Sequence, residues 1–289
     1  MAGEHLRPGT IRRRFAAALA AGATLLLLGA CSPDPSGLSG IGAVAAPEVV
    51  AVATTTTSRD GSQTTTSAAP VFAREIIGRS VDGRPIEMFT SGEGPRHVIV
   101  LGGIHGDETG GEVARALLEY LERHPEVLPK DTVLAIIPVA NPDGEAAGTR
   151  GNANGVDLNR NFPSRNWSAD LGSGDSPAQG LTGGETAGSE PETKALLARL
   201  AEGCDLVVSL HSFGGLIDFD GPGSEEIAEA MSDICGLPVR HMVHQQYVTG
   251  SLGIFVPERY EAPVITVELD GPELSPGLRK ALLFAIGGS

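Results

Sequence analysis

The sequence predicts an α/β fold in which a mostly parallel, mixed sheet has helices on both faces. Two observations predict it: 41% of the 289 residues are hydrophobic, and apolar strand-like segments alternate along the chain with segments of helical periodicity. Strands that are apolar throughout are typical of a parallel sheet covered on both faces. With three cysteines and 4% aromatic residues, the fold depends on an aliphatic core and not on a disulfide scaffold.

The first elements are a hairpin and a strand followed by a helix. Residues 75–77 and 86–89 flank the turn dipeptide Asp82-Gly83, which predicts an antiparallel hairpin. Residues 97–101 are an apolar run that ends in two glycines, and this predicts a buried strand. Residues 108–123 carry apolar side chains at helical spacing, so a helix follows that strand after a short loop.

The same alternation continues to the end of the chain. Residues 132–139, 205–210 and 264–269 predict three further buried strands. One helix begins at Ser189, where Ser-Glu-Pro-Glu predicts a capping box with a proline in the first turn. A last helix is capped by Ser275, which a proline follows.

The chain divides into three parts by composition. Residues 1–30 predict a signal peptide, because Arg12-Arg13-Arg14 precedes an apolar run too short for a membrane span. Small residues before Cys31 resemble a bacterial lipobox, with ordinary cleavage and a free cysteine as the alternative. The arginines also resemble a twin-arginine signal, so either export route is open. Residues 31–70, rich in Thr, Ser, Ala and Pro, predict a disordered tether, and residues 71–289 are expected to form the folded domain.

Charge excludes one class of partner. The formal net charge is −15, and Lys and Arg cluster only within the first 15 residues. A nucleic-acid-binding protein needs a basic face, so we expect no nucleic acid partner. We expect contact with a membrane only through the N-terminal lipid, on the extracytoplasmic face.

Candidate metal ligands lie at the ends of the predicted strands. His105 and Glu108 follow the first buried strand, His211 follows the third, and Glu268 lies at the end of the fourth. In open α/β sheets the carboxyl ends of the strands meet at the ligand-binding edge. Two imidazoles and one carboxylate form a His₂Glu set that suits catalytic zinc, and Glu268 is then a candidate general base. The long stretch 144–188 has no periodicity, and such loops are usually functional.

Five motifs occur in a fixed order over nearly the whole domain: His-Gly-Asp-Glu at 105–108, Asn-Pro-Asp-Gly at 141–144, Gly-Val-Asp-Leu-Asn-Arg-Asn-Phe-Pro at 155–163, His-Ser at 211–212 and Val-Glu-Leu at 267–269. In this order they resemble the zinc carboxypeptidase family, in particular its bacterial branch of murein peptide amidases. The resemblance implies the same fold and one zinc ion. It makes His105, Glu108 and His211 the zinc ligands and Glu268 the base that activates the attacking water.

The resemblance also implies residues that bind the substrate. Asn159 and Arg160 match the pair that holds the terminal carboxylate of the substrate, for which an amide and a guanidinium are suited. Arg150 matches the arginine that polarises the scissile carbonyl, with Arg165 as a rival. Tyr247 lies where the family often has a tyrosine that closes over substrate, and an ordinary surface tyrosine is the equal alternative.

The implied activity is hydrolysis of peptide amide bonds, in particular the bond between γ-D-glutamate and diaminopimelate in small cell-wall peptides, by a monomer. Asp107 stands where many digestive members have arginine, as in the bacterial branch, and Leu252 gives no charge to the expected side-chain pocket. Two alternatives remain: an aspartoacylase-like N-acyl amino acid deacylase, and a lipoprotein that binds wall peptides without cleaving them. A disulfide between Cys204 and Cys235 is also open in an exported protein.

Overall fold

A computed structural model describes residues 71–172, 178, 180–212, 214–242 and 248–287. The predicted signal peptide, the lipid-attachment residue Cys31, the tether and Tyr247 lie outside these residues. Within the described ranges, no helix combines the length and the apolar character needed to cross a bilayer.

The described residues form one sheet with the strand order β1-β2-β4-β3-β5-β7-β6. Strands β4, β3, β5 and β7 run parallel. Strand β2 pairs antiparallel with β4, β6 with β7, and β1 with β2, so the predicted mixed, mostly parallel sheet is confirmed. The strands are β1 Ala73–Arg79, β2 Pro85–Ser91, β3 Arg96–Leu101, β4 Thr132–Ile137, β5 Leu206–Ser212, β6 Leu216–Asp220 and β7 Val264–Leu269.

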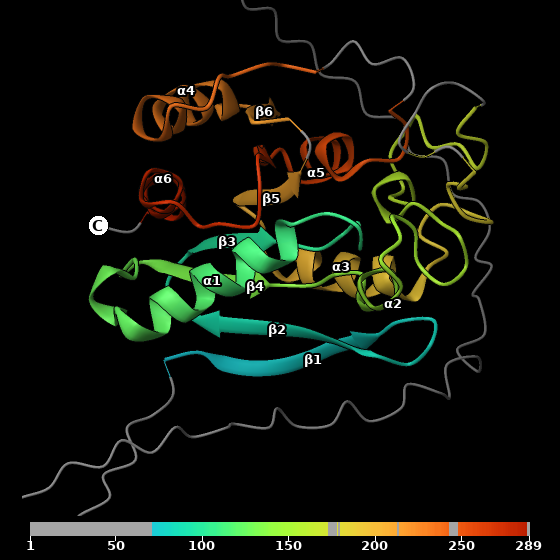
Figure 1. Cartoon of the computed structure of the whole chain (residues 1–289), viewed down its shortest axis with the longest axis horizontal. Helices are drawn as coiled ribbons and strands as arrows, with labels where there is room; N and C mark the ends of the chain where they lie inside the picture. The colour runs from blue at the N-terminus through green and yellow to red at the C-terminus, as the bar shows by residue number, and fades with distance from the viewer. Residues whose placement is uncertain (1–70, 173–177, 179, 213, 243–247, 288–289) are drawn as a thin grey trace, which may run out of the picture. The chain divides into compact units, whose positions relative to one another are not determined.

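Helices cover both faces of the sheet (Figure 1). Helices α1, α4 and α6 bury their apolar residues against one face, and α4 packs against α6. Helices α3 and α5 cover the opposite face. The helices are α1 Gly110–Arg123, α2 Pro142–Ala147, α3 Pro191–Glu202, α4 Ser224–Cys235, α5 Leu252–Tyr260 and α6 Pro276–Ile286, with short 3₁₀ turns η1 Pro125–Val127 and η2 Leu158–Arg160.

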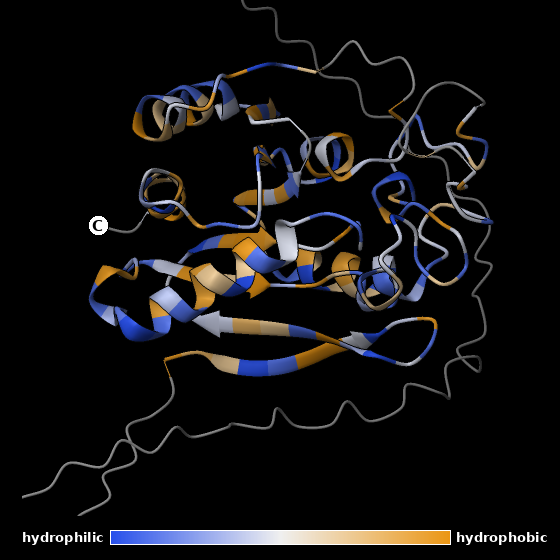
Figure 2. Ribbon diagram, viewed as in Figure 1, coloured by the Kyte–Doolittle hydropathy of each residue, from blue (hydrophilic) through white to orange (hydrophobic). Residues whose placement is uncertain are grey.

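The hydropathy of the strands follows their position in the sheet. Figure 2 shows β3, β4 and β5 as mostly hydrophobic, whereas the hairpin strands β1 and β2 mix hydrophobic and hydrophilic residues. Central strands lie between two helical layers and lose water from both faces, which stabilises the fold by about 25 cal/mol for each Å² of apolar surface removed from water. For this reason the central strands can be predicted from the sequence, in which they occur as continuous apolar runs.

The predicted capping box of α3 is wrong. The helix begins at Pro191 with Glu190 as its N-cap, and no side chain caps it. Ser189 Oγ donates to Glu190 Oε1 at 2.6 Å, and Glu192 Oε1 accepts from the backbone N–H of Val81 at 3.1 Å. Ser189 therefore bonds its neighbour Glu190 and Glu192 bonds the hairpin turn, so neither side chain caps the helix. By contrast, the predicted cap of α6 is present, since Ser275 accepts from the N–H of Leu278.

The order of the central strands brings the site residues to one edge. β5 lies between β3 and β7, and all three are parallel, so their carboxyl ends meet. The long unperiodic stretch 144–188 contains the end of α2 and the η2 turn and otherwise has no helix or strand in its described part.

Candidate active site

The three predicted metal ligands converge at the carboxyl edge of the sheet. His105 and Glu108 lie in the loop between β3 and α1, and His211 lies near the end of β5. Their ligand atoms all lie within 4.8 Å of one another, and the three residues are buried. His105 Nδ1 is 2.8 Å from Glu108 Oε1, and His211 Nδ1 is 2.9 Å from Glu108 Oε2. A non-helical loop thus presents a His and a Glu toward a His on the neighbouring strand.

Glycines let this loop pack closely enough to form the cluster. A Cβ on Gly106 would lie 1.9 Å from the carbonyl carbon of Gly144 in α2, and one on Gly110 would lie 2.0 Å from the carbonyl oxygen of Leu210 in β5. Backbone therefore contacts backbone at both ends of the ligand loop. A larger residue at either position would push His105 and Glu108 away from His211.

A buried carboxylate lies behind His105. Asp157 Oδ1 is 2.9 Å from His105 Nε2, and Asp157 Oδ2 accepts from Arg150 Nε at 3.0 Å. Burial alone would raise the pKa of Asp157, but His105 and Arg150 lower it well below the usual range, so Asp157 is ionised. A carboxylate that accepts from one imidazole nitrogen leaves the other nitrogen free for a metal and fixes the ring. Sequence reasoning did not single out Asp157, although it belongs to the quoted motif at 155–163.

Arg150 lies in the site and Arg165 does not. Arg150 Nη1 donates to Glu108 Oε1 at 2.8 Å, in addition to its bond to Asp157. Burial opposes the charge of Arg150, but Asp157 and Glu108 outweigh it and raise its pKa. Arg165 pairs with Glu258 at 3.0 Å with its side chain 87% exposed. Of the two rival arginines, only Arg150 can reach a group bound between the predicted ligands.

Asn159 and Arg160 lie in the η2 turn beside the cluster. Asn159 Oδ1 accepts from the N–H of Leu252 at 2.9 Å, which ties this turn to the start of α5 and leaves the amide nitrogen to donate. Arg160 Nη1 donates to the carbonyl of Asn159 at 2.7 Å. Burial lowers the pKa of Arg160 and Arg150 adds to this, while the nearby Asp157 and Glu108 oppose it. Among the described residues, no carboxylate oxygen lies within ion-pair distance of Arg160. A half-buried guanidinium that forms no ion pair within the protein is suited to an anionic ligand.

Glu268 lies on β7 directly opposite His211 of β5. It is half-buried and receives no hydrogen bond from the described residues. Burial raises the pKa of Glu268, and the nearby Glu108 adds to this, while His211, His105 and Arg150 oppose it. A carboxyl group whose pKa moves toward neutrality suits general acid and base chemistry.

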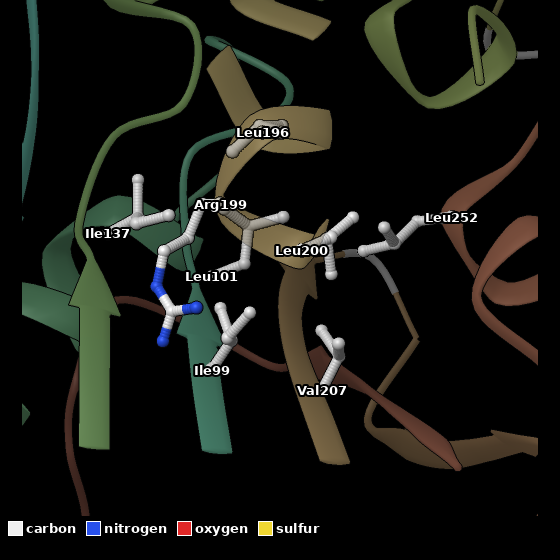
Figure 3. A pocket seen from close by; sticks show the side chains of 8 residues that line it. All are labelled: Ile99, Leu101, Ile137, Leu196, Arg199, Leu200, Val207 and Leu252. Carbon is white, nitrogen blue, oxygen red and sulfur yellow. The ribbon is translucent and has the colours of Figure 1, made fainter. Parts of the chain in front are cut away.

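Other predicted residues lie apart from this cluster. Cys204 and Cys235 are free and pack on opposite faces of the sheet, so they form no disulfide. Burial raises the pKa of the Cys204 thiol to about 12, so this thiol is unreactive at neutral pH. Leu252 is a core residue and not a wall of a substrate pocket. Its side chain lines a small internal cavity between the sheet and α3, together with Arg199 and six aliphatic residues (Figure 3).

The residues at the cluster fit a zinc ion. Two imidazole nitrogens and one carboxylate, with a second carboxylate behind an imidazole, form the ligand set of catalytic zinc sites that keep one position open. When bound, zinc supplies Lewis-acid chemistry: it polarises a carbonyl and makes water more acidic.

Known proteins share both the sequence and the fold. The profile of the family described as zinc carboxypeptidase matches residues 62–230. Murein peptide amidase A of Vibrio campbellii is 33% identical over 222 residues, which cover 74% of this chain and 85% of that protein. Its counterpart in Escherichia coli K12 is 36% identical over 185 residues, covering 57% of this chain and 69% of that protein. The crystal structure of murein-tripeptide amidase MpaA from Escherichia coli O157 superposes with a TM-score of 0.56 at 31% identity, covering 74% of this chain and 89% of that one.

The solved relative shares this fold across 89% of its own chain, and the residues that converge here form a metal-ligand set that fits zinc. The chain belongs to the zinc carboxypeptidase family.

Proposed function

We propose that this protein hydrolyses the amide bond before a C-terminal residue in short cell-wall peptides, in particular the bond between γ-D-glutamate and diaminopimelate. The observation that carries the proposal is Arg160, which lies half-buried beside the His105, Glu108 and His211 cluster and forms no ion pair with the described residues. A peptide with a free terminal carboxylate can bind Arg160 and bring its last amide bond to the metal. The names of the murein peptide amidases support the cell-wall substrate.

The roles of the site residues follow from their positions. Glu268 takes a proton from the attacking water and later gives one to the leaving nitrogen, since its raised pKa suits both steps. Arg150, held by Asp157 through Nε, keeps its positive charge and donates to the carbonyl oxygen as negative charge develops there. Asn159 and Arg160 hold the terminal carboxylate, which fixes the distance from that carboxylate to the scissile bond.

Mass spectrometry tests the activity. The purified protein is incubated with an L-Ala-γ-D-Glu-diaminopimelate tripeptide, with zinc and separately with a chelator. We expect release of diaminopimelate only with zinc, and loss of release in Glu268→Gln. If zinc binds and no peptide is cleaved, the proposal is refuted; cleavage of N-acyl amino acids alone would then support a deacylase, and tight peptide binding without turnover a binding lipoprotein.

We also propose that residues 1–30 direct export and that Cys31 carries a lipid that holds the domain on the extracytoplasmic face of the membrane. The basic residues, the short apolar run and the small residues before Cys31 support this. Labelling of cells with a fatty acid tests it, with Cys31→Ser as the control. We expect label and membrane recovery in the natural sequence and neither in the variant. Equal membrane recovery of both would contradict lipid anchoring.

A further inference from the structure

A tight turn lies between two residues of the active site. Arg150 and Asp157 stand at its two ends, and Asp157 Oδ2 accepts from Arg150 Nε at 3.0 Å. The backbone N–H of Asn152 donates to the carbonyl of Val156 at 3.0 Å, and the N–H of Gly155 donates to the carbonyl of Asn152 at 2.9 Å. The chain therefore folds back on itself at Asn152, and this brings the two ends of the turn together.

The side chain of Asn152 closes the same turn from inside. Its Oδ1 accepts from the N–H groups of Asn154 and Val156, each at 3.1 Å. An asparagine that accepts from the backbone N–H two residues further along the chain stabilises a turn in this way. Asn152 is buried, so water does not compete for these bonds.

The amide nitrogen of Asn152 fixes the turn to the start of helix α3. Its Nδ2 donates to Glu190 Oε2 at 2.8 Å and to Glu192 Oε2 at 3.1 Å. One amide nitrogen carries two hydrogens, so each carboxylate takes one, while the amide oxygen already accepts two N–H groups. Aspartate has the same shape but no hydrogen to donate, and it would place a third carboxylate against the other two.

The two carboxylates belong to well-anchored parts of the fold. Both are buried at the beginning of α3. Glu190 Oε1 accepts from Ser189 Oγ at 2.6 Å, and Glu192 Oε1 accepts from the N–H of Val81, in the hairpin turn between β1 and β2, at 3.1 Å. Burial alone would raise the pKa of Glu190, but the hydrogen bonds that it accepts outweigh burial and lower the pKa. Asn152 therefore ties its turn to a helix and to a hairpin.

The position of the turn decides where the charge of Arg150 lies. The side chain is 12% exposed, and its Nη1 donates to Glu108 Oε1 at 2.8 Å. At the other end of the turn, Asp157 Oδ1 lies 2.9 Å from His105 Nε2. A displacement of about 1 Å in an active site can cost about 100-fold in rate. The anchoring of the turn therefore bears on the chemistry, although no bond among the described residues joins Asn152 to the metal ligands.

We propose that Asn152 is a positioning residue, which holds the pair of Arg150 and Asp157 beside the metal ligands by fixing their turn to Glu190 and Glu192. The effect on catalysis rests on the proposed peptidase function. The effect on the position of Arg150 does not depend on that function, so the two can be tested separately.

Steady-state kinetics with saturating zinc test the effect on catalysis. Asn152→Ala should lower kcat for the tripeptide about 10- to 100-fold and change KM less, because Arg150 acts as charge develops on the carbonyl while Asn159 and Arg160 bind the terminal carboxylate. Asn152→Ser keeps a side-chain oxygen for the turn and removes only the amide nitrogen. It should show the same change in kcat, and it serves if the alanine variant does not fold.

Asn154→Ala is the matched control. Asn154 Nδ2 also donates to Glu190 Oε2, at 2.8 Å, but this side chain is exposed and does not close the turn. Its kcat should stay within about twofold of the wild type. A double variant separates positioning from general damage: in an Arg150→Ala background, Asn152→Ala should lower kcat by less than about threefold. An equal loss in both backgrounds would overturn the proposal.

NMR reads the position of Arg150 without a substrate. The Nε–H signal of Arg150 is identified by its absence in Arg150→Lys. Because this N–H donates to Asp157, it should be protected from hydrogen exchange in the wild type and in Asn154→Ala. In Asn152→Ala or Asn152→Ser the protection should fall about tenfold or more.

The two experiments fail in different ways. Unchanged protection in folded variants at Asn152 would overturn the proposal, whatever the peptide assays show. If the wild type with zinc cleaves no peptide but the protection falls as expected, the proposed peptidase function fails and the positioning of Arg150 by Asn152 stands.

Discussion

Replacement of Asp157 by asparagine isolates the contribution of the carboxylate behind His105. The side chain keeps its shape, but an amide nitrogen must face either His105 Nε2 or Arg150 Nε, which lie 2.9 and 3.0 Å from the two carboxylate oxygens. Both of those nitrogens are donors when His105 binds metal through Nδ1, so one hydrogen bond is replaced by a contact between two donors. The ring of His105 is then held less firmly toward Glu108 and His211.

The expected magnitude follows from this geometry. Changes to such outer carboxylates lower metal affinity about 10- to 100-fold, or about 1.4–2.7 kcal/mol. Loss of a buried hydrogen bond to a charged group also destabilises the metal-free protein by about 1.5–3 kcal/mol. At about 2–4 °C for each kcal/mol in a domain of this size, the melting temperature should fall measurably.

Competition with a chromophoric chelator measures the zinc affinity, and thermal unfolding with and without zinc measures stability. Asp143→Asn is the control, because Asp143 is another buried carboxylate, with bonds to Ser80 and Arg84 and none to the ligands. That variant should lose stability and keep the zinc affinity of its folded form. If Asp157→Asn binds zinc within about twofold of the wild type, the orienting role of Asp157 is refuted.

Three further predictions concern the base, the carboxylate-binding arginine and acid stability. Glu268→Gln should retain zinc and lose turnover about 10²- to 10⁴-fold, measured by metal analysis and peptide cleavage; activity like that of the wild type would remove Glu268 as the base. Arg160→Ala should raise KM more than it lowers kcat in steady-state assays, and unaltered kinetics would place Arg160 outside the substrate site. Burial raises the pKa of Asp143, but bonds from the Asp82 N–H, Ser80 and Arg84 outweigh it and lower the pKa. Its contribution to stability is therefore present above the unfolded pKa of about 3.9 and lost as the pH falls through the lower folded pKa. Urea unfolding of the metal-free protein from pH 6 to about pH 2 should show this loss, and an equal pH slope in Asp143→Asn would contradict it.

The sequence determined the central part of the fold. Apolar runs at 97–101, 132–139, 205–210 and 264–269 predicted β3, β4, β5 and β7, because strands buried on both faces must be apolar throughout. Strand β6 was not predicted: Leu-Ile-Asp-Phe-Asp alternates with acidic residues, and an edge strand with a polar face has no continuous apolar run. The helices α4 and α5 were likewise not predicted.

The sequence also indicated the principal site residues. They lie at or just after the ends of strands that the apolar runs predict: His105, Glu108, His211 and Glu268. It could not identify Asp157 as the partner of His105, since 52 residues separate them along the chain. Nor could it exclude Arg165 as the rival of Arg150, because the path of the loop that carries both arginines decides which of them enters the site.

Tertiary structure decided which side chains become neighbours. Hydrophobic periodicity reports whether a residue faces a core, which is a local property of the chain. The order of strands and their register are set by packing between segments far apart in sequence. For that reason the chemistry of the metal ligands can be predicted from the sequence alone, while the placement of Glu268 directly opposite His211 exists only once β5 and β7 are aligned.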